Sequence, residues 1–121
     1  MGLEVSINEG SDHVAIALDG ELDIYTVAGF RQELERFDPS QTRLVIDLSE
    51  VSLLDSSGLG ALVSLLNQSR DTDGQLGLVC PERRLRRVFE ISGLRRAFVF
   101  GETEAAVQSA LDAERDEQET S

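Results

Sequence analysis

The chain has 121 residues, a net charge of −12 and a single cysteine, and all 11 of its basic residues are arginine. A chain of this length suits one domain, and its negative charge disfavours binding to nucleic acid or to an anionic membrane. The sequence contains no lysine, which excludes a Walker A phosphate loop, and no apolar run long enough to span a bilayer. It shows no signal peptide and no cysteine pair for a disulfide, so we expect a cytoplasmic protein.

Two strands are predicted at the start of the chain. Apolar and polar residues alternate over 3–8, the large apolar residues Val14, Ile16 and Leu18 alternate next, and the turn-forming residues 10–12 separate the two runs. Alternation is typical of half-buried strands, so these runs predict an antiparallel hairpin. His13, the only histidine, falls at the edge of this hairpin without an evident carboxylate or serine partner, and we interpret it as a solvated turn residue.

The rest of the chain alternates helical and strand patterns. We expect helices over 27–37, 59–70, 82–92 and 103–112, and strands over 44–48, 76–80 and 97–100. The first helix would end at Asp38-Pro39. Strands separated by helices pair in parallel through right-handed crossovers. The order β-β-α-β-α-β-α-β-α therefore predicts an α/β fold, with one domain over 1–112 built from a mixed, mostly parallel sheet and about four packed helices.

Charge is unevenly distributed along the second half of the chain. Six arginines gather in and after the third predicted helix: Arg83, Arg84, Arg86, Arg87, Arg95 and Arg96. We favour a solvated helix face that pairs with neighbouring acids over a nucleic-acid site, and a protein-docking role stays open. Residues 113–121 are acidic and polar without an apolar anchor, so we expect a disordered tail there.

A serine pair lies at the predicted junction between a strand and a helix. A buried strand over 44–48 and a connector over 49–54 lead through Asp55 to Ser56 and Ser57, and the apolar spacing of a helix follows. At a helix N-terminus, Ser or Asp side chains cap the unpaired amides, and the positive dipole tolerates a phosphate. The two glycines of the first turn cost a helix about 1 kcal/mol each, so we expect another molecule to approach their backbone closely. The plain alternative is that the serines only cap the helix.

The sequence offers the serines no catalytic partners. His13 is the one possible base, and it lies far from Ser56 and Ser57 in the sequence. The serines also lack the preceding glycine of a nucleophile elbow, so we expect no enzyme activity. An accessible serine can instead be the substrate of a kinase. Phosphorylation adds about −1.5 to −2 charges, which near Asp55 and Asp23 would block a docking partner by bulk and repulsion.

Other motifs do not predict a metal or cofactor site. Asp71-x-Asp73-Gly74 is too short for a calcium loop. Gly58-Leu59-Gly60 begins like a dinucleotide fingerprint, but Val63 occupies the third glycine position. Cys80 ends an apolar run and is expected to be a small buried core residue. We therefore expect no cofactor.

Three segments resemble the motifs of one family. The hexapeptide Asp55-Ser56-Ser57-Gly58-Leu59-Gly60 resembles the phosphorylation motif of the anti-sigma factor antagonists, the bacterial members of the STAS domain family. Gly20-Glu21-Leu22-Asp23 and the segment from Val88 to Leu94 resemble the family's other two motifs. The similarity covers residues 3–112.

The resemblance implies a partner-switching role in transcription regulation. The unphosphorylated protein would bind an anti-sigma factor that is also a serine kinase and so release a sigma factor. Phosphorylation of Ser56 would end this binding, and a PP2C-type phosphatase would restore it. The residues implied in partner binding are Asp23, Asp55, Ser56, Ser57, Gly58, Leu59 and Gly60. The alternatives are a STAS scaffold or regulatory module with another partner, and a small serine hydrolase.

Overall fold

The structure is a computed structural model that describes residues 2–36 and 43–120. Over these residues the chain forms, in order, β1 (Leu3–Glu9), β2 (Val14–Leu22), α1 (Val27–Leu34), β3 (Arg43–Leu54), α2 (Ser56–Asp71), β4 (Gln75–Val79), α3 (Arg83–Ile91), β5 (Val99–Gly101) and α4 (Glu104–Thr120). This order confirms the predicted alternation of strands and helices. The first helix ends at Leu34, earlier than the predicted helix over 27–37, and the predicted stop at Phe37 and Asp38-Pro39 lies outside the described residues.

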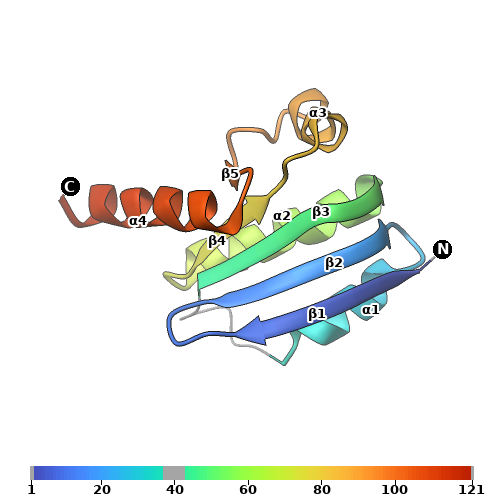
Figure 1. Ribbon diagram of the computed structural model, residues 1–121, viewed down its shortest axis with the longest axis horizontal. Helices are drawn as coiled ribbons and strands as arrows, with labels where there is room; N and C mark the ends of the chain where they lie inside the picture. The colour runs from blue at the N-terminus through green and yellow to red at the C-terminus, as the bar shows by residue number, and fades with distance from the viewer. Residues whose placement is uncertain (1, 37–42, 121) are drawn as a thin grey trace.

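The strands form one mixed sheet in the order β1-β2-β3-β4-β5. β1 and β2 pair antiparallel, whereas β2, β3, β4 and β5 pair in parallel. Figure 1 shows the sheet with α4 crossing the face in front of β4 and β5. Because parallel strands end at the same edge of a sheet, the segments that follow β2 and β3 lie next to each other. That edge carries the serine pair.

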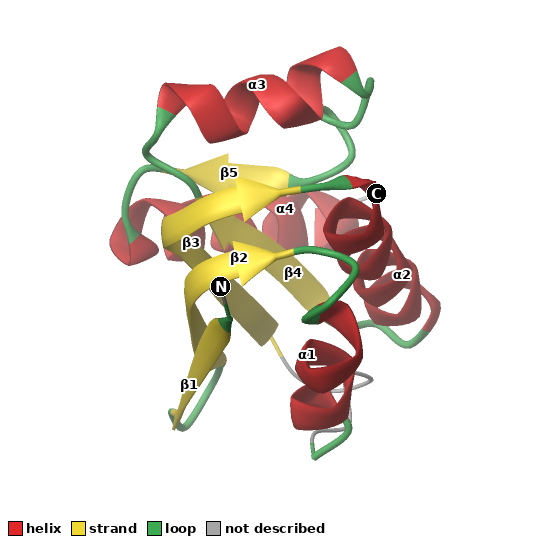
Figure 2. Ribbon diagram, turned by 90° about the vertical axis from the view of Figure 1, so that its right-hand side faces the viewer, coloured by secondary structure: helices red, strands yellow, loops and turns green. Residues whose placement is uncertain are grey.

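The helices cover the two faces of the sheet unequally. The larger core lies between the sheet and helices α1, α2 and α3, with Ile46 and Leu78 meeting Phe30, Leu62 and Phe89. In Figure 2, α1 and α2 lie side by side along this face. A smaller core joins the opposite face to α4 through a second set of side chains: Val45, Val79, Val107 and Leu111. The α2 helix is therefore held firmly along its length, which fixes the position of its first turn.

β3 is longer than the sequence predicted. The residues expected to form a connector, 49–54, continue the strand and pair with the second half of β2, as Asp19↔Glu50 and Leu22↔Leu54 show. Polar residues interrupt the apolar pattern, but Val51 and Leu54 are buried on the helical face. The prediction of a connector was wrong, and the serine pair follows a paired strand directly.

His13 also differs from its prediction. Its Nδ1 lies 2.9 Å from Asp12 Oδ1 and its Nε2 lies 2.9 Å from Glu104 Oε1, so it joins the β1–β2 turn to the start of α4. Its side chain is 21% exposed. The hydrogen bond with Asp12 raises the pKa of His13, and the bond with Glu104 adds to this effect. The expectation of a solvated residue without a carboxylate partner was wrong.

The end of the chain is helical as far as Thr120, where the sequence predicted a disordered tail over 113–121. Gln75 Nε2 donates hydrogen bonds to Leu111 O at 2.8 Å and to Glu114 Oε1 at 3.2 Å. Arg43 forms an ion pair with Asp112 at 2.8 Å. These contacts carry the helix beyond the last buried apolar residue. Ser121 lies outside the described residues.

Candidate functional site

Ser56 is the first residue of α2, and its side chain is exposed. The residue that caps the helix is Asp55, whose Oδ1 accepts a hydrogen bond from Gly58 N at 3.0 Å. The Ser56 hydroxyl makes no hydrogen bond with any described residue. Asp55 therefore caps the helix, and the interpretation of Ser56 as a plain cap is wrong. Ser57 is half-buried beside it.

The two glycines of the first turn have different surroundings. A Cβ on Gly58 would collide with the backbone oxygen of Leu22 and would lie 2.9 Å from Leu54 Cδ1. A Cβ on Gly60 would meet nothing within 4 Å, and Gly60 is exposed. Gly58 is therefore required by the close packing of α2 on its own sheet, in place of the expected approach of another molecule. Leu59 is buried, so its side chain belongs to the core.

Asp23 shapes the loop between β2 and α1. Its carboxylate accepts hydrogen bonds from Tyr25 N at 2.9 Å and from Thr26 N at 3.1 Å. Only 8% of Asp23 is exposed, so the carboxylate is turned into the protein. Thr26 adds to the same network by donating its hydroxyl hydrogen to Glu21 O at 2.7 Å. The structure therefore gives Asp23 a positioning role in this loop.

Asp55 connects that loop to the start of α2. Its Oδ2 accepts a hydrogen bond from Ile24 N at 3.1 Å, while its backbone N donates to Leu22 O at 3.3 Å. These bonds place Ile24 and Tyr25, which are 63% and 91% exposed, next to the exposed first turn of the helix. We call the resulting patch the Ser56 surface; it consists of Ile24, Tyr25, Ser56, Ser57 and Gly60.

No motif in the sequence predicted a role for Ile24 and Tyr25. Neither belongs to a periodic apolar pattern, and an Ile-Tyr pair in a loop gives no sign of its exposure. The available signal was their position directly after the Gly20–Asp23 segment. Exposed aromatic residues on a rigid loop are typical anchors of protein–protein interfaces.

His13 lies too far from Ser56 and Ser57 to act as their general base. β2 runs from Val14 at one edge of the sheet to Leu22 at the other, so His13 lies about 30 Å of strand away from the Ser56 surface. Burial raises the pKa of the Cys80 thiol to about 11, which keeps it in the unreactive protonated form. Neither side chain can activate Ser56 or act as a nucleophile beside it.

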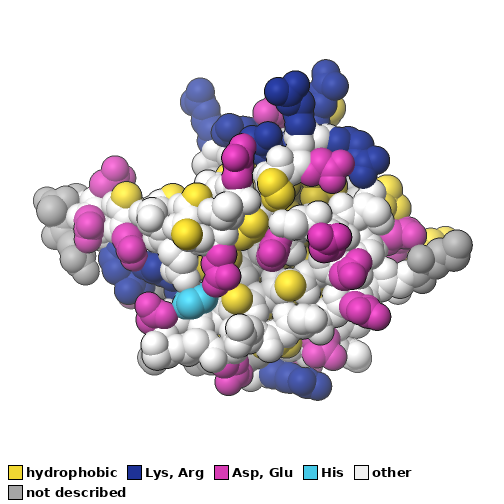
Figure 3. All heavy atoms as spheres, in the orientation of Figure 1, with side chains coloured by type: hydrophobic (Ala, Val, Ile, Leu, Met, Phe, Trp, Pro, Cys, Tyr) yellow, Lys and Arg dark blue, Asp and Glu magenta, His cyan; other side chains and the backbone are white. Residues whose placement is uncertain are grey.

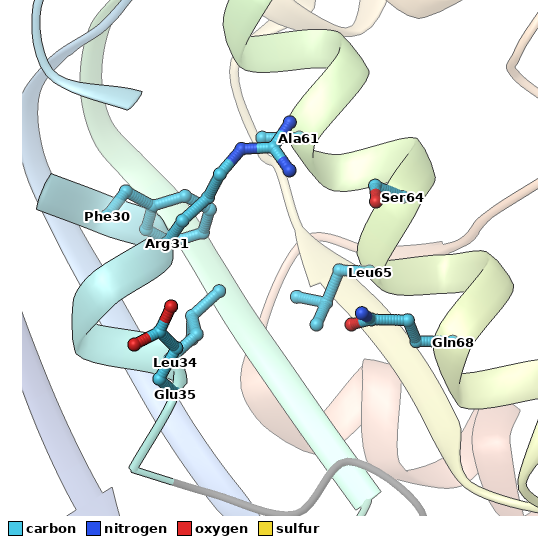
Figure 4. Close-up of a pocket in the computed structure, with 8 residues that line it drawn as sticks. All are labelled: Phe30, Arg31, Leu34, Glu35, Ala61, Ser64, Leu65 and Gln68. Atoms are coloured by element: carbon cyan, nitrogen blue, oxygen red, sulfur yellow. The ribbon is translucent and has the colours of Figure 1, made fainter. Parts of the chain in front are cut away.

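The described residues contain no group of three or more side chains arranged to hold a metal ion. None of their helices combines the length and the apolar character needed to cross a bilayer. A groove of about 280 Å³ lies between α1 and α2. Figure 4 shows Leu34 and Leu65 facing each other across it, with Arg31 and Gln68 at its rim. None of the predicted site residues lines this groove.

Known proteins of one family resemble most of this chain. Residues 4–110 match the STAS domain. The anti-sigma-B factor antagonist of Listeria monocytogenes is 38% identical over 96 residues, which cover 78% of this chain and 84% of that protein. A crystal structure of an anti-sigma factor antagonist from Mycobacterium paratuberculosis superposes with a TM-score of 0.80 at 26% identity, covering 89% of this chain and 92% of that one. The anti-sigma factor antagonist SpoIIAA in its unphosphorylated form gives a TM-score of 0.72 at 25% identity, with 93% and 97% covered.

Proposed function

Because the chain belongs to the STAS domain family, we propose that it is an anti-sigma factor antagonist that phosphorylation of Ser56 switches off. The unphosphorylated protein binds an anti-sigma factor with serine kinase activity in the bacterial cytoplasm, and the sigma factor is released. The kinase then uses ATP to phosphorylate Ser56 and dissociates, and a PP2C-type phosphatase resets the protein. The observation that supports this best is an exposed Ser56 hydroxyl whose capping role Asp55 has taken.

The position of Ser56 explains how a phosphate could stop binding without unfolding the protein. A phosphoserine carries about −1.5 to −2 charges at neutral pH. At the start of the 16-residue α2 helix, the positive end of the helix dipole offsets this charge. The added group would stand beside Ile24 and Tyr25, where it obstructs a partner that packs on these side chains. The phosphate therefore acts on the complex, and the fold is left intact.

The same geometry argues against catalysis by the protein itself. A hydrolase needs a base within hydrogen-bond reach of its nucleophile. The only histidine of the chain is engaged by Asp12 and Glu104 at the other edge of the sheet. We propose a protein without enzyme activity of its own.

The experiment is a phosphorylation and binding assay with the serine-kinase anti-sigma factors of the source bacterium. Mass spectrometry should find the phosphate on Ser56, and a Ser109→Ala control, at an exposed serine of α4, should be phosphorylated at the same rate. Ser56→Ala should bind the kinase but resist release by ATP. Ser56→Asp should bind about a hundredfold more weakly, with a free energy of unfolding within about 0.5 kcal/mol of wild type.

Two results would contradict the proposal. One is phosphorylation at a different residue with Ser56 untouched. The other is an unmodified protein that binds none of these kinases but does bind another regulatory protein, which would support the alternative of a STAS scaffold or regulatory module. Treatment of the phosphorylated protein with a PP2C-type phosphatase should restore kinase binding.

A further inference from the structure

The outer side of α3 carries a stripe of exposed arginines. Arg83, Arg84 and Arg87 are exposed, and Ile91, one helical turn beyond Arg87, is 83% exposed. At 3.6 residues per turn these four residues lie on one side of the helix. We call this stripe the α3 face. In Figure 3 most of the dark blue side chains gather over α3, whereas most of the charged groups over the sheet are acidic.

The α3 helix is anchored by its opposite side. Leu85 and Phe89 are buried, and the Phe89 ring packs edge-on against Phe98 and Phe100 with ring centroids 5.6 and 5.0 Å apart. This apolar contact anchors the helix on the sheet. Like charges one turn apart, such as Arg83 and Arg87, disfavour a helix. Arg83 and Arg87 are therefore not explained by the stability of the fold.

Neighbouring acids neutralise only part of this charge. Arg84 lies 3.6 Å from Glu82, Arg86 lies 3.9 Å from Glu102, and Arg95 lies 3.6 Å from Glu90. Arg83, Arg87 and Arg96 have no ion-pair partner among the described residues. The predicted pairing with nearby acids is thus confirmed for three of the six arginines. A positive surface is left on a protein whose net charge is −12.

We propose that the α3 face is a second docking surface, which binds an acidic segment of a partner protein that carries apolar side chains. Guanidinium groups bind carboxylates in a forked geometry, and Arg83 and Arg87 present two of them one turn apart. Ile91 extends the stripe with an apolar contact that a purely electrostatic site would not need. Charge complementarity favours a short acidic segment, because a nucleic acid or an anionic membrane would extend over the acidic surroundings and be repelled.

The α3 face adjoins the segment that leads to Ser56. The Arg84 guanidinium donates a hydrogen bond to Ser52 O at 3.3 Å, near the end of β3. The α3 face and the Ser56 surface share no residue, so binding at the α3 face is measured on the unphosphorylated protein. The proposal stands independently of the proposed function.

The test measures binding of a labelled peptide by fluorescence anisotropy at low ionic strength. The peptide consists of glutamates with a leucine at every fourth position. Wild-type protein should bind it, and added salt should weaken binding. The double variant Arg83→Glu/Arg87→Glu should lose about tenfold in affinity. The matched control is Arg31→Glu/Arg115→Glu, which changes the net charge equally at two exposed arginines without ion-pair partners among the described residues, and should lose less than about twofold.

A second variant separates the apolar contribution from charge. Ile91→Ser should lower the affinity for the leucine-containing peptide about threefold and leave the affinity for an all-glutamate peptide unchanged. Circular dichroism checks the fold, and Arg83→Gln/Arg87→Gln replaces the charge reversal if that variant unfolds. The proposal is overturned if neither peptide binds, if the control loses as much affinity as the α3 variant, or if single-stranded DNA or anionic vesicles bind more tightly. Self-association that Arg83→Glu/Arg87→Glu abolishes would also overturn it, since the occupant would then be a second copy.

Discussion

The two ends of β2 use carboxylates in different ways. At its carboxyl end, Asp23 and Asp55 accept hydrogen bonds from backbone N–H groups. At its amino end, Asp12 and Glu104 each lie 2.9 Å from a ring nitrogen of His13. Backbone amides do not titrate, whereas imidazole changes charge near neutral pH. The first end is therefore held by hydrogen bonds to the backbone, and the second contains a link that is sensitive to pH.

This difference suits the two ends to different tasks. The carboxyl end presents Ser56 and the exposed Tyr25 on a backbone fixed by hydrogen bonds, as a preorganised binding surface requires. The amino end holds the β1–β2 turn against α4 and exposes no comparable apolar side chain among the described residues. Rigidity at one end and a titratable link at the other can be tested separately.

The largest effect is expected from alanine at Gly58. Its Cβ would collide with the Leu22 carbonyl, so Gly58→Ala should lower the free energy of unfolding by about 3 kcal/mol. Gly60→Ala is the matched control in the same helical turn. With open space around it, this control should raise the free energy of unfolding by about 0.5–1 kcal/mol through helix propensity. Urea denaturation measures both, and equal losses in the two variants would contradict the packing described for Gly58.

Most of the fold could be predicted from the sequence because its elements have regular apolar spacing. Alternation over 3–8 and 14–18 corresponds to β1 and β2, and the helical spacing that begins at Leu59 belongs to α2. The second half of β3 could not be predicted in this way. Ser49, Glu50 and Ser52 break the apolar pattern, and pairing with an irregular stretch of β2 maintains the strand there.

The site was predictable in position but not in the roles of its residues. The motif around Ser56 identified the exposed serine, since it follows a strand and begins a helix. The buried state of Asp23 depends on how the β2–α1 loop folds back on it, and no local pattern encodes that. Likewise, the contact between His13 and Glu104 joins residues 91 positions apart in the sequence.

Removal of the Asp55 side chain should have a smaller effect on stability, at the carboxyl end of β2. Asp55→Ala removes the acceptors of Gly58 N and Ile24 N, so it should lower the free energy of unfolding by about 2 kcal/mol. Asp55→Asn keeps one side-chain oxygen and should cost about half as much. Asp19→Ala, which removes an exposed acid on β2, should change stability by less than about 0.5 kcal/mol. If the alanine variant at Asp55 were no less stable than the Asp19 control, the two hydrogen bonds would not hold the loop.

The smallest effect is expected at the amino end of β2, where it should depend on pH. Because Asp12 and Glu104 raise the pKa of His13 in the folded protein, the protonated imidazole stabilises the fold. That contribution is fully present below the unfolded pKa of about 6.5 and is lost as the pH rises through the higher folded pKa. His13→Gln should therefore lower the free energy of unfolding by less than about 1 kcal/mol in mild acid and leave it unchanged in mild alkali. Urea denaturation at several pH values measures this difference. A pH-independent cost at His13 would contradict the stabilising role given to its protonated form.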